Sequence, residues 1–563
     1  MLFLDYKMFR FFNINIRFIA LIFFILHALM FWKIPFLFGS PEEKLYALQT
    51  AKNFSVNGFL ATNGLSNYAR IDAEPAIYSH LIDLSAYIIY ITNSIDVNFT
   101  FLKLFFFILI LGSFYVSYVI SKKFVPEQWA FVLATFSVIA PKVFVIWSEV
   151  HWPMTLLCIN LTGLIAIKLL ETQSKKYLLL YQLNLIFACF FSWFAAVGVL
   201  ATSFAIKLFI KKKPILRSLF FNSLLVFLAM VCIKLAWNAS YFGFLNEMEE
   251  IRMTITNRIY GDPSSLEMQD FFNSSGIVVW GAAGVNGTVL LHYFLNLASS
   301  LLLPIILIFI ALIFIKKNKN TESKLLILFL AFFGQIAWAI LFPAHMVGYG
   351  NIIFYTSLRF FFALLTVLIF STVLQALPKA SGNSVINFQL IQNNKIFKKG
   401  KIDLKFGIRR SLEFTASIFV CVIFYYITTI NWKFFSYAKQ GFEVPSIILE
   451  KIDKKVVYTN MSSIYLSYSS DSALVSGRCS PEAFLYKSPA FCLNNFENVK
   501  ENFSVLSEPQ FFVFNKDYRS GNTLWSTDEE LSKFQKILDT NLFKVLEVKD
   551  VSNTSWILYQ FNK

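Results

Sequence analysis

The sequence predicts a polytopic α-helical membrane protein that ends in a small α/β domain, and three observations lead to this prediction. Of the 563 residues, 56% are hydrophobic and only 15% are charged, which is more apolar surface than a water-soluble core of this size can bury. The apolar residues form long runs, and the basic residues cluster between them. From about residue 431 onward, the chain becomes more polar and contains short runs typical of β-strands.

Nine apolar segments are each long enough to cross a bilayer as one helix. They lie at about 16–38, 99–120, 129–147, 152–170, 218–238, 289–315, 324–343, 352–378 and 411–430. The apolar stretch 177–210 is too long for one span, and we interpret it as two passes that meet near Ser192. This gives 11 crossings. Basic residues precede the first span and no small-residue cleavage site follows it, so we expect an uncleaved anchor.

The basic clusters assign the loops to the two sides of the membrane. If the N-terminus is cytoplasmic, every lysine cluster falls on the cytoplasmic side, as positive-inside topology requires. These clusters lie at 122–123, 175–176, 211–213, 316–317 and in the basic loop 379–410. A single span at 177–210 would place the later clusters outside. The outer side then receives 39–98, 148–151, 239–288, 344–351 and the tail 431–563.

This pattern predicts a multi-pass protein of a bacterial-type cell (inner) membrane, in contact with membrane lipids. The net charge of +16 belongs to the cytoplasmic loops, so we expect no nucleic-acid partner. Domain boundaries follow from the change in composition: a transmembrane domain at 1–430 and an extracytoplasmic α/β domain at 431–563.

The tail carries five β-rich runs and one helix signal. The runs lie at 456–458, 464–468, 511–514, 545–548 and 556–561. Thr527 and Glu530 have the spacing of a capping box before an apolar helical face. In an oxidising outer compartment, we expect Cys479 and Cys492 to pair.

Adjacent carboxylates stand directly after the first span. Glu42 and Glu43 follow Pro41, which is a suitable first helical residue. A carboxylate held at the membrane surface can deprotonate an acceptor hydroxyl, and a low-dielectric neighbourhood raises its pKa. The alternative is that both acids only stabilise the N-terminus of a helix. Residue type alone favours the second interpretation.

Two further groups are candidates for substrate binding. Glu149 lies in the short outer turn between Trp147 and Trp152; the alternative is an ordinary interfacial turn with an aromatic belt. Arg359 lies well inside an apolar span, where an unpaired guanidinium is costly and usually functional. A lipid phosphate would suit it; otherwise Arg359 snorkels or pairs with an internal acid. Lys234 is a second intramembrane cation for the same role.

The first outer loop resembles that of the GT-C superfamily of membrane glycosyltransferases, such as protein O-mannosyltransferases and aminoarabinose transferases. The likeness rests on one apolar span, the acidic pair Glu42-Glu43, Tyr46 and Ala51, and the later element Glu74-Pro75. It covers about residues 1–378 and is sharpest over 39–80. It implies an inverting transferase that moves a sugar from a polyprenyl-phosphate-linked donor to a glycan, lipid or protein acceptor on the outer face.

The resemblance also implies roles for individual residues. Glu42 or Glu43 would be the catalytic base; because relatives carry Asp-Glu at this position, which acid acts stays open. The substrate-binding set would be Glu74, Glu149, His151, Lys234, His345, Tyr349 and Arg359. Tyr355 precedes Arg359 by four residues, which departs from the adjacent Arg-Tyr of relatives. No resident cofactor is expected, although outer acids could hold a divalent cation. The rival hypothesis is a lipid or solute transporter, or flippase.

Overall fold

The computed structural model describes residues 16–33, 50–51, 54–55, 58–65, 84–92, 100–139, 147, 151–210, 214–260, 295, 305–308, 310, 319–342, 351–376, 385–392, 395–403, 415–432, 456–459, 473–476, 511–515, 536, 543–551 and 554–561. Most of these residues are helical. Six of the described helices are long and apolar enough to cross a membrane. The prediction of a polytopic helical membrane protein is therefore confirmed at this level.

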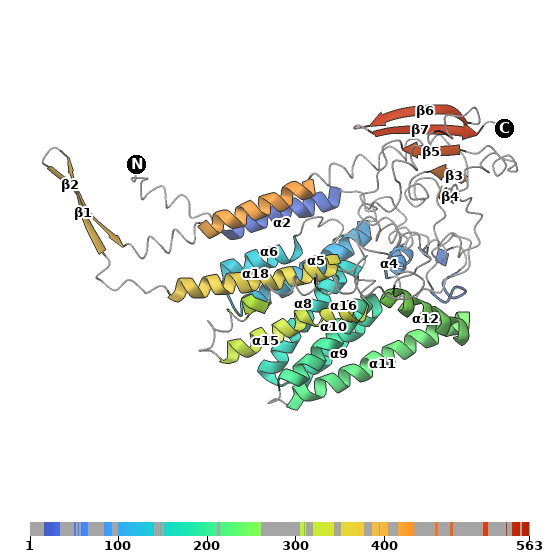
Figure 1. The fold of residues 1–563 in the computed structure, drawn as a ribbon, viewed down its shortest axis with the longest axis horizontal. Coiled ribbons are helices and arrows are strands. Elements are labelled where there is room, and N and C mark those ends of the chain that lie inside the picture. The colour runs from blue at the N-terminus through green and yellow to red at the C-terminus, as the bar shows by residue number, and fades with distance from the viewer. Residues whose placement is uncertain are drawn as a thin grey trace.

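The helices pack as one elongated bundle (Figure 1). Those at the N-terminal side are α2 (Ile16–Lys33), α4 (Leu84–Thr92), α5 (Thr100–Ser121), α6 (Glu127–Val138), α8 (His151–Thr172), α9 (Lys175–Phe191) and α10 (Trp193–Phe209). Then follow α11 (Pro214–Phe242), α12 (Phe244–Tyr260), α15 (Lys319–Phe333), α16 (Ile336–Leu341) and α18 (Asn351–Ala376). The final helix, Thr415–Trp432, carries no label in Figure 1 and lies beside α2.

The prediction of two helices within 177–210 is confirmed. Helices α9 and α10 meet at Ser192, whose backbone is extended and whose side chain accepts a hydrogen bond from the Ala195 N–H as an N-cap. The two helices also pack against each other, and Tyr181 Oη donates to the Val199 carbonyl at 2.8 Å. A serine that caps the second helix explains the break within a continuous apolar stretch.

Two predicted spans are interrupted in the structure. Helix α6 ends at Val138, well before the end of the expected span 129–147, and Ile139 is already extended. Pro141 provides the cause, because the residue before a proline is driven out of the helical region and proline has no N–H to donate. The expected span 324–343 is divided into α15 and α16 by Gly334 and Gln335. Most of the span 289–315 lies outside the described residues.

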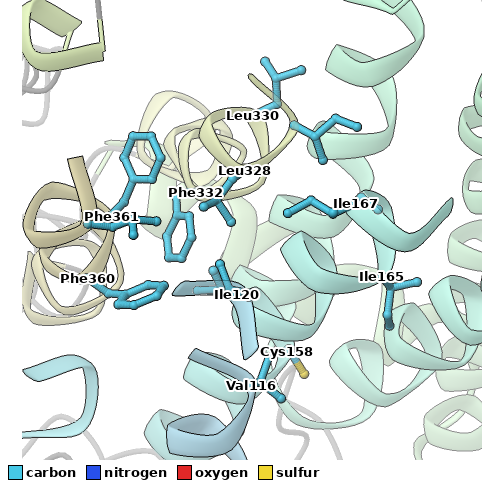
Figure 2. Close-up of a cluster of buried hydrophobic side chains, with 14 of the residues drawn as sticks. Val116, Ile120, Cys158, Ile165, Ile167, Leu328, Leu330, Phe332, Phe360 and Phe361 are labelled. Atoms are coloured by element: carbon cyan, nitrogen blue, oxygen red, sulfur yellow. The ribbon is translucent and has the colours of Figure 1, made fainter. Parts of the chain in front are cut away.

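The bundle core lies where α5, α8, α15 and α18 meet. Figure 2 shows Phe360 and Phe361 of α18 facing Phe332 of α15, and the Phe332 and Phe361 rings stack with centroids 5.5 Å apart. Ile120 of α5 belongs to the same buried cluster. The aromatic residues of the apolar runs thus supply helix–helix packing.

The first and last described spans are joined by a buried polar contact. Asn431 Nδ2 donates to His27 Nε2 at 3.0 Å, and His27 Nδ1 lies 2.7 Å from the Phe23 carbonyl. The His27 tautomer with its proton on Nδ1 satisfies both contacts. Phe23 also stacks on Phe424 at 5.2 Å. These contacts fix the register between α2 and the final helix.

One end of the bundle carries a cluster of charges around Glu171. Its carboxylate contacts Lys123 at 2.9 Å, Lys168 at 3.3 Å and Lys324 at 2.8 Å. Lys123 follows α5, and Lys324 lies in the first turns of α15. The contacts bring together three chain segments that the basic pattern assigns to a common side of the membrane.

Close packing between α10 and the α15–α16 break depends on glycine. A Cβ added at Gly198 would overlap the Gln335 side chain, and one at Gly334 would overlap Thr202 Oγ1 and the Gly198 carbonyl. Thr202 Oγ1 donates to the Gly198 carbonyl at 2.7 Å and contacts the Leu330 carbonyl at 3.3 Å. Small residues let helix backbones approach in this way in membrane proteins.

Replacing Gly198 with leucine should therefore destabilise the protein. The new side chain must displace buried Gln335, and overpacking of this kind costs about 1–3 kcal/mol. The measurement is thermal unfolding in detergent, with Gly112→Leu as the matched control, because the nearest atoms to a Cβ there are Leu157 methyl groups at 3.5 Å and 3.6 Å. Equal melting temperatures for the two variants would contradict the packing argument.

Two sheets accompany the helices. Strands β1 (Val385–Gln392) and β2 (Lys395–Asp403) form an antiparallel hairpin in the segment that the sequence indicated only as a basic loop. The second sheet has the order β4-β3-β5-β7-β6. It contains β3 (Val456–Thr459), β4 (Ala473–Ser476), β5 (Phe511–Asn515), β6 (Phe543–Val551) and β7 (Thr554–Phe561).

Four of the five predicted tail strands are confirmed, at β3, β5, β6 and β7. The sheet is mixed: β3 pairs in parallel with β4 and β5, whereas β7 is antiparallel to β5 and β6. The run 464–468, the capping box and both cysteines of the expected disulfide lie outside the described residues. Figure 1 shows this sheet and the β1–β2 hairpin at opposite ends of the bundle.

Candidate functional site

The structure describes only part of the predicted site. Glu42, Glu43, Glu74, Glu149, His345 and Tyr349 lie outside the described residues, and of His151 only the backbone is described, as the first residue of α8. Lys234 and Arg359 are described with their side chains. The site is therefore built from these two cations and from the described turn of the first outer loop, 58–65.

Aromatic packing holds this turn in place. Phe54 and Phe59, before and within it, pack on Tyr87 and Tyr90 of α4, with ring centroids between 5.4 and 5.9 Å apart, and on each other at 5.2 Å. Tyr87 Oη donates to the Gly64 carbonyl at 2.7 Å. Gly64 has a positive φ of 63°, and a Cβ there would clash with Tyr87 and Phe59. Glycine is therefore needed for this turn.

The same turn is fastened to the corner between α11 and α12. Trp237 Nε1 donates to the Asn63 carbonyl at 2.8 Å, and Asn63 Nδ2 donates to Ser240 Oγ at 2.9 Å. Asn63 itself has a positive φ of 53°. Two hydrogen bonds to one residue thus fix the first outer loop against the end of α11.

Close to this contact along α11 begins a chain of polar groups, in which Lys234 is partly buried and Asn238 and Glu247 are buried. Lys234 Nζ donates to Asn238 Oδ1 at 2.9 Å, and Asn238 Nδ2 donates to Glu247 Oε1 at 2.9 Å. Lys234 and Asn238 are one turn apart on α11, and Glu247 belongs to the first turn of α12. Lys234 lies eight residues before Phe242, or about 12 Å from the end of α11 at the helical rise.

Glu247 is an unusual carboxylate. It is only 2% exposed, and its Oε2 has no hydrogen-bond partner among the described residues. Burial raises the pKa of this carboxyl above its ordinary value, and the Asn238 hydrogen bond and the charge of Lys234 oppose that shift only in part. A buried carboxylate with a free oxygen and a neighbouring ammonium is typical of functional sites.

Arg359 occupies a different part of the bundle. Its Nη2 donates to the Phe136 carbonyl at 2.8 Å, and its guanidinium lies over the Phe136 ring at 4.8 Å. Phe136 belongs to the last turn of α6, whose final carbonyls lack the usual helical partners. Arg359 therefore caps an interrupted helix. Within the described part of the chain, its partners are a carbonyl and an aromatic face, and no acid there contacts it.

Arg359 still has unused hydrogen-bonding capacity. Its Nε is buried without a hydrogen-bond partner among the described residues. It lies eight residues into α18, about 12 Å from the start of that helix. By chain position, this is the same depth as that of Lys234 in α11.

The two cations do not form one cluster. Helix α11 packs mainly on α9, α10 and α12, whereas α18 packs on α6, α8 and α15, and Figure 1 shows other helices of the bundle between α11 and α18. The structure brings the turn 58–65 together with Trp237 and Ser240 of α11, the helix that carries Lys234. It does not bring Lys234 together with Arg359.

Trp147 proves not to be part of an interfacial belt. It is fully buried, packs on Phe24, Phe31 and Phe107 at 5.6 to 6.3 Å, and donates from Nε1 to the Val138 carbonyl at 2.8 Å. The belt interpretation is wrong for this residue. Trp147 instead helps to satisfy the open end of α6 and ties it to α2.

Three buried polar residues of the described bundle were not predicted from the sequence. Glu247 lies in the segment 239–288 that the basic clusters assign to the outer side, and neither it nor Asn238 was identified from the sequence as a site residue. Lys103 is buried in α5, and its Nζ lies 3.3 Å from the carbonyl of Trp32 near the end of α2. A lone lysine within the apolar segment 99–120 was the signal for Lys103. The spacing of Lys234 and Asn238 at i and i+4 was a signal for the pair.

No metal centre appears in the described part of the chain, which contains no group of three His, Cys, Asp or Glu side chains suited to an ion. The sequence matches no protein-family model and no curated protein. The function must therefore be argued from the membrane architecture, the first outer loop and the two partly buried cations.

Proposed function

We propose that this chain is a membrane glycosyltransferase that moves a sugar from a polyprenyl-phosphate-linked donor to an acceptor at the outer face, with inversion. Glu42 or Glu43 of the first outer loop is the base that activates the acceptor hydroxyl. One observation supports this more than any other. The described turn of that loop is hydrogen-bonded to the end of α11, the helix that carries the partly buried Lys234.

The proposal includes a complete topology. Eleven helices cross a bacterial-type inner membrane, the N-terminus is cytoplasmic, and 431–563 forms an extracytoplasmic domain. The position of the C-terminal sheet and the β1–β2 hairpin at opposite ends of the bundle supports this arrangement, since 379–410 is the basic segment assigned to the cytoplasm.

The roles follow from charge and position. Lys234, on the helix that contacts the first loop, binds the carrier phosphate and stabilises it as it leaves. Arg359 offers a second anion-binding group at the interrupted end of α6. Glu74, Glu149, His151, His345 and Tyr349 complete the substrate site as the resemblance implies, and outer acids can hold a divalent cation.

A transporter or flippase is the second candidate, and one structural observation favours it. Helix α6 ends inside an apolar segment. Interrupted helices line the substrate sites of many transporters. A transporter, however, has no need of the paired carboxylates in the first outer loop.

The two functions are separated in sealed proteoliposomes that contain a radiolabelled polyprenyl-phosphate sugar and a pool of outer-face acceptors. Transfer of label to an acceptor without movement of intact donor between leaflets supports the transferase. Donor movement without transfer overturns it in favour of the transporter.

Replacing Arg359 with methionine should lower kcat/KM for transfer about 100-fold, because about 3 kcal/mol of charged hydrogen bonding to substrate is lost. Arg359→Lys should retain intermediate activity, since lysine keeps the charge but not the planar fork. Steady-state kinetics and thermal unfolding are measured together. A lower melting temperature with unchanged kcat/KM would reduce Arg359 to a structural cap of α6.

A further inference from the structure

We propose that Glu247 is an internal anion that occupies a phosphate-binding pair, Lys234 and Asn238, and that an external phosphodiester replaces it and releases α12 from α11. The choice of a phosphodiester rests on the proposed function. The competition between Glu247 and an external anion for Lys234 and Asn238 is argued from the contacts of these three residues.

Among the described side chains of α12, one is buried against α11. Glu247 is the only buried side chain among those that the structure describes in this helix. Its neighbours Phe244, Leu245 and Met248 are exposed, with Leu245 at 81%. An apolar face does not hold α12 down within this described part. The buried hydrogen bond from Asn238 Nδ2 to Glu247 Oε1 does, together with an exposed one from Asn246 Nδ2 to the Phe242 carbonyl at 2.9 Å beside Gly243.

The pair that receives Glu247 has the chemistry of an anion site. Asn238 supplies an amide donor, and Lys234 supplies an ammonium whose charge acts on Glu247. Glu247 uses only one of its two oxygens, since Oε2 is without a partner among the described residues. The two non-bridging oxygens of a phosphodiester can satisfy the Asn238 amide and the Lys234 ammonium together. The external anion therefore makes a better match than the internal one.

The chain at the corner allows α12 to move while α11 stays fixed. Gly243 joins the two helices with a positive φ of 85°, and a Cβ there would meet nothing within 4 Å. The end of α11 is held separately, by the contacts of Trp237 and Ser240 with Asn63. Release of Glu247 therefore frees α12 at Gly243 and leaves the first outer loop in place.

Among the described side chains, few charged groups lie near the pair. On α12, Glu249 and Arg252 are exposed and form an ion pair with each other, and burial raises the pKa of Glu247. On α11, Tyr241 is the remaining described titratable group near the corner, and the turn 58–65 contains none. Protonation of Glu247 should therefore weaken the internal competitor as the pH falls.

The test is equilibrium binding of a radiolabelled farnesyl methyl phosphodiester, whose single charge does not titrate, to the full-length protein in lipid nanodiscs. Glu247→Gln removes the internal anion and should bind the probe about 10-fold more tightly at pH 7. Glu249→Gln is the matched control on the same helix and should bind like wild type. Lys234→Met and Asn238→Leu should each lose most of the binding.

Two further readouts separate this proposal from a structural role of Glu247. Wild-type affinity should rise more steeply between pH 7.5 and pH 5 than the affinity of Glu247→Gln. Probe binding should also accelerate amide hydrogen exchange across 244–260 in wild type but not in Lys234→Met. Exchange in α11 shows whether each variant is folded.

Equal or weaker probe binding by Glu247→Gln would overturn the competition, and if Lys234→Met still lost binding, the phosphate role of Lys234 would stand. Undiminished binding by Lys234→Met would overturn both the competition and that role. The failure of this inference is thereby distinct from the failure of the proposed function.

Discussion

Substituting Glu43 with glutamine should abolish sugar transfer while leaving expression and folding intact. Glutamine has almost the same shape as glutamate but cannot accept a proton from the acceptor hydroxyl. The loss of a general base typically lowers the rate by about 10²- to 10⁴-fold. The measurement is single-turnover transfer by the purified variant, with thermal unfolding as the test of folding.

Glu42→Gln is the matched partner of this experiment, because the sequence leaves open which acid is the base. We expect one amide to lose transfer and the other to retain most of it. Both acids lie outside the described residues, so the expectation rests on the resemblance of the loop. Retained activity in both single variants would contradict the base assignment. It would favour the alternative that Glu42 and Glu43 only stabilise the N-terminus of a helix.

Substituting Glu171 with glutamine should destabilise the protein by about 1 kcal/mol, because one carboxylate in a surface network joins three ammonium groups from different chain segments. Lys123, Lys168 and Lys324 all contact its carboxylate, and the side chains of Lys123, Lys324 and Glu171 are only 17–20% exposed. Without the carboxylate, three ammonium groups from three chain segments repel one another.

Glu127→Gln is the control for Glu171. Glu127 contacts Arg17 at 3.6 Å, but both side chains are about half exposed, and exposed pairs of this kind contribute little. Thermal unfolding of both variants in the same detergent should show a measurable loss for Glu171→Gln and none for Glu127→Gln. Similar losses in the two variants would mean that the Glu171 cluster does not hold the helices together.

The sequence predicted the helical architecture well because its signals are local. Lipid solvent demands long apolar helices, and the break at Ser192 followed from the basic clusters on either side of 177–210. Four strands of the tail were predicted from β-branched and aromatic runs. The β1–β2 hairpin was missed because its charged residues were interpreted as loop composition, although 385–392 contains an alternating pattern.

The site was predicted less completely, because its contacts join distant parts of the chain. Lys234 and Arg359 were recognisable as cations inside apolar spans. Their partners were not, since the Phe136 carbonyl is 223 residues away from Arg359 along the chain. Asn63 and Trp237 are similarly separated, by 174 residues. No local pattern indicates which outer acid will be buried, and so Glu247 could not be distinguished from Glu249.

The most direct test of the central claim is transfer by purified wild-type protein in lipid, from a broad pool of radiolabelled polyprenyl-phosphate sugars to a pool of cell-envelope acceptors. The account predicts that label leaves the lipid carrier, appears on an acceptor with inverted configuration, and leaves an equal amount of polyprenyl phosphate. No transfer from any donor in the pool would contradict it.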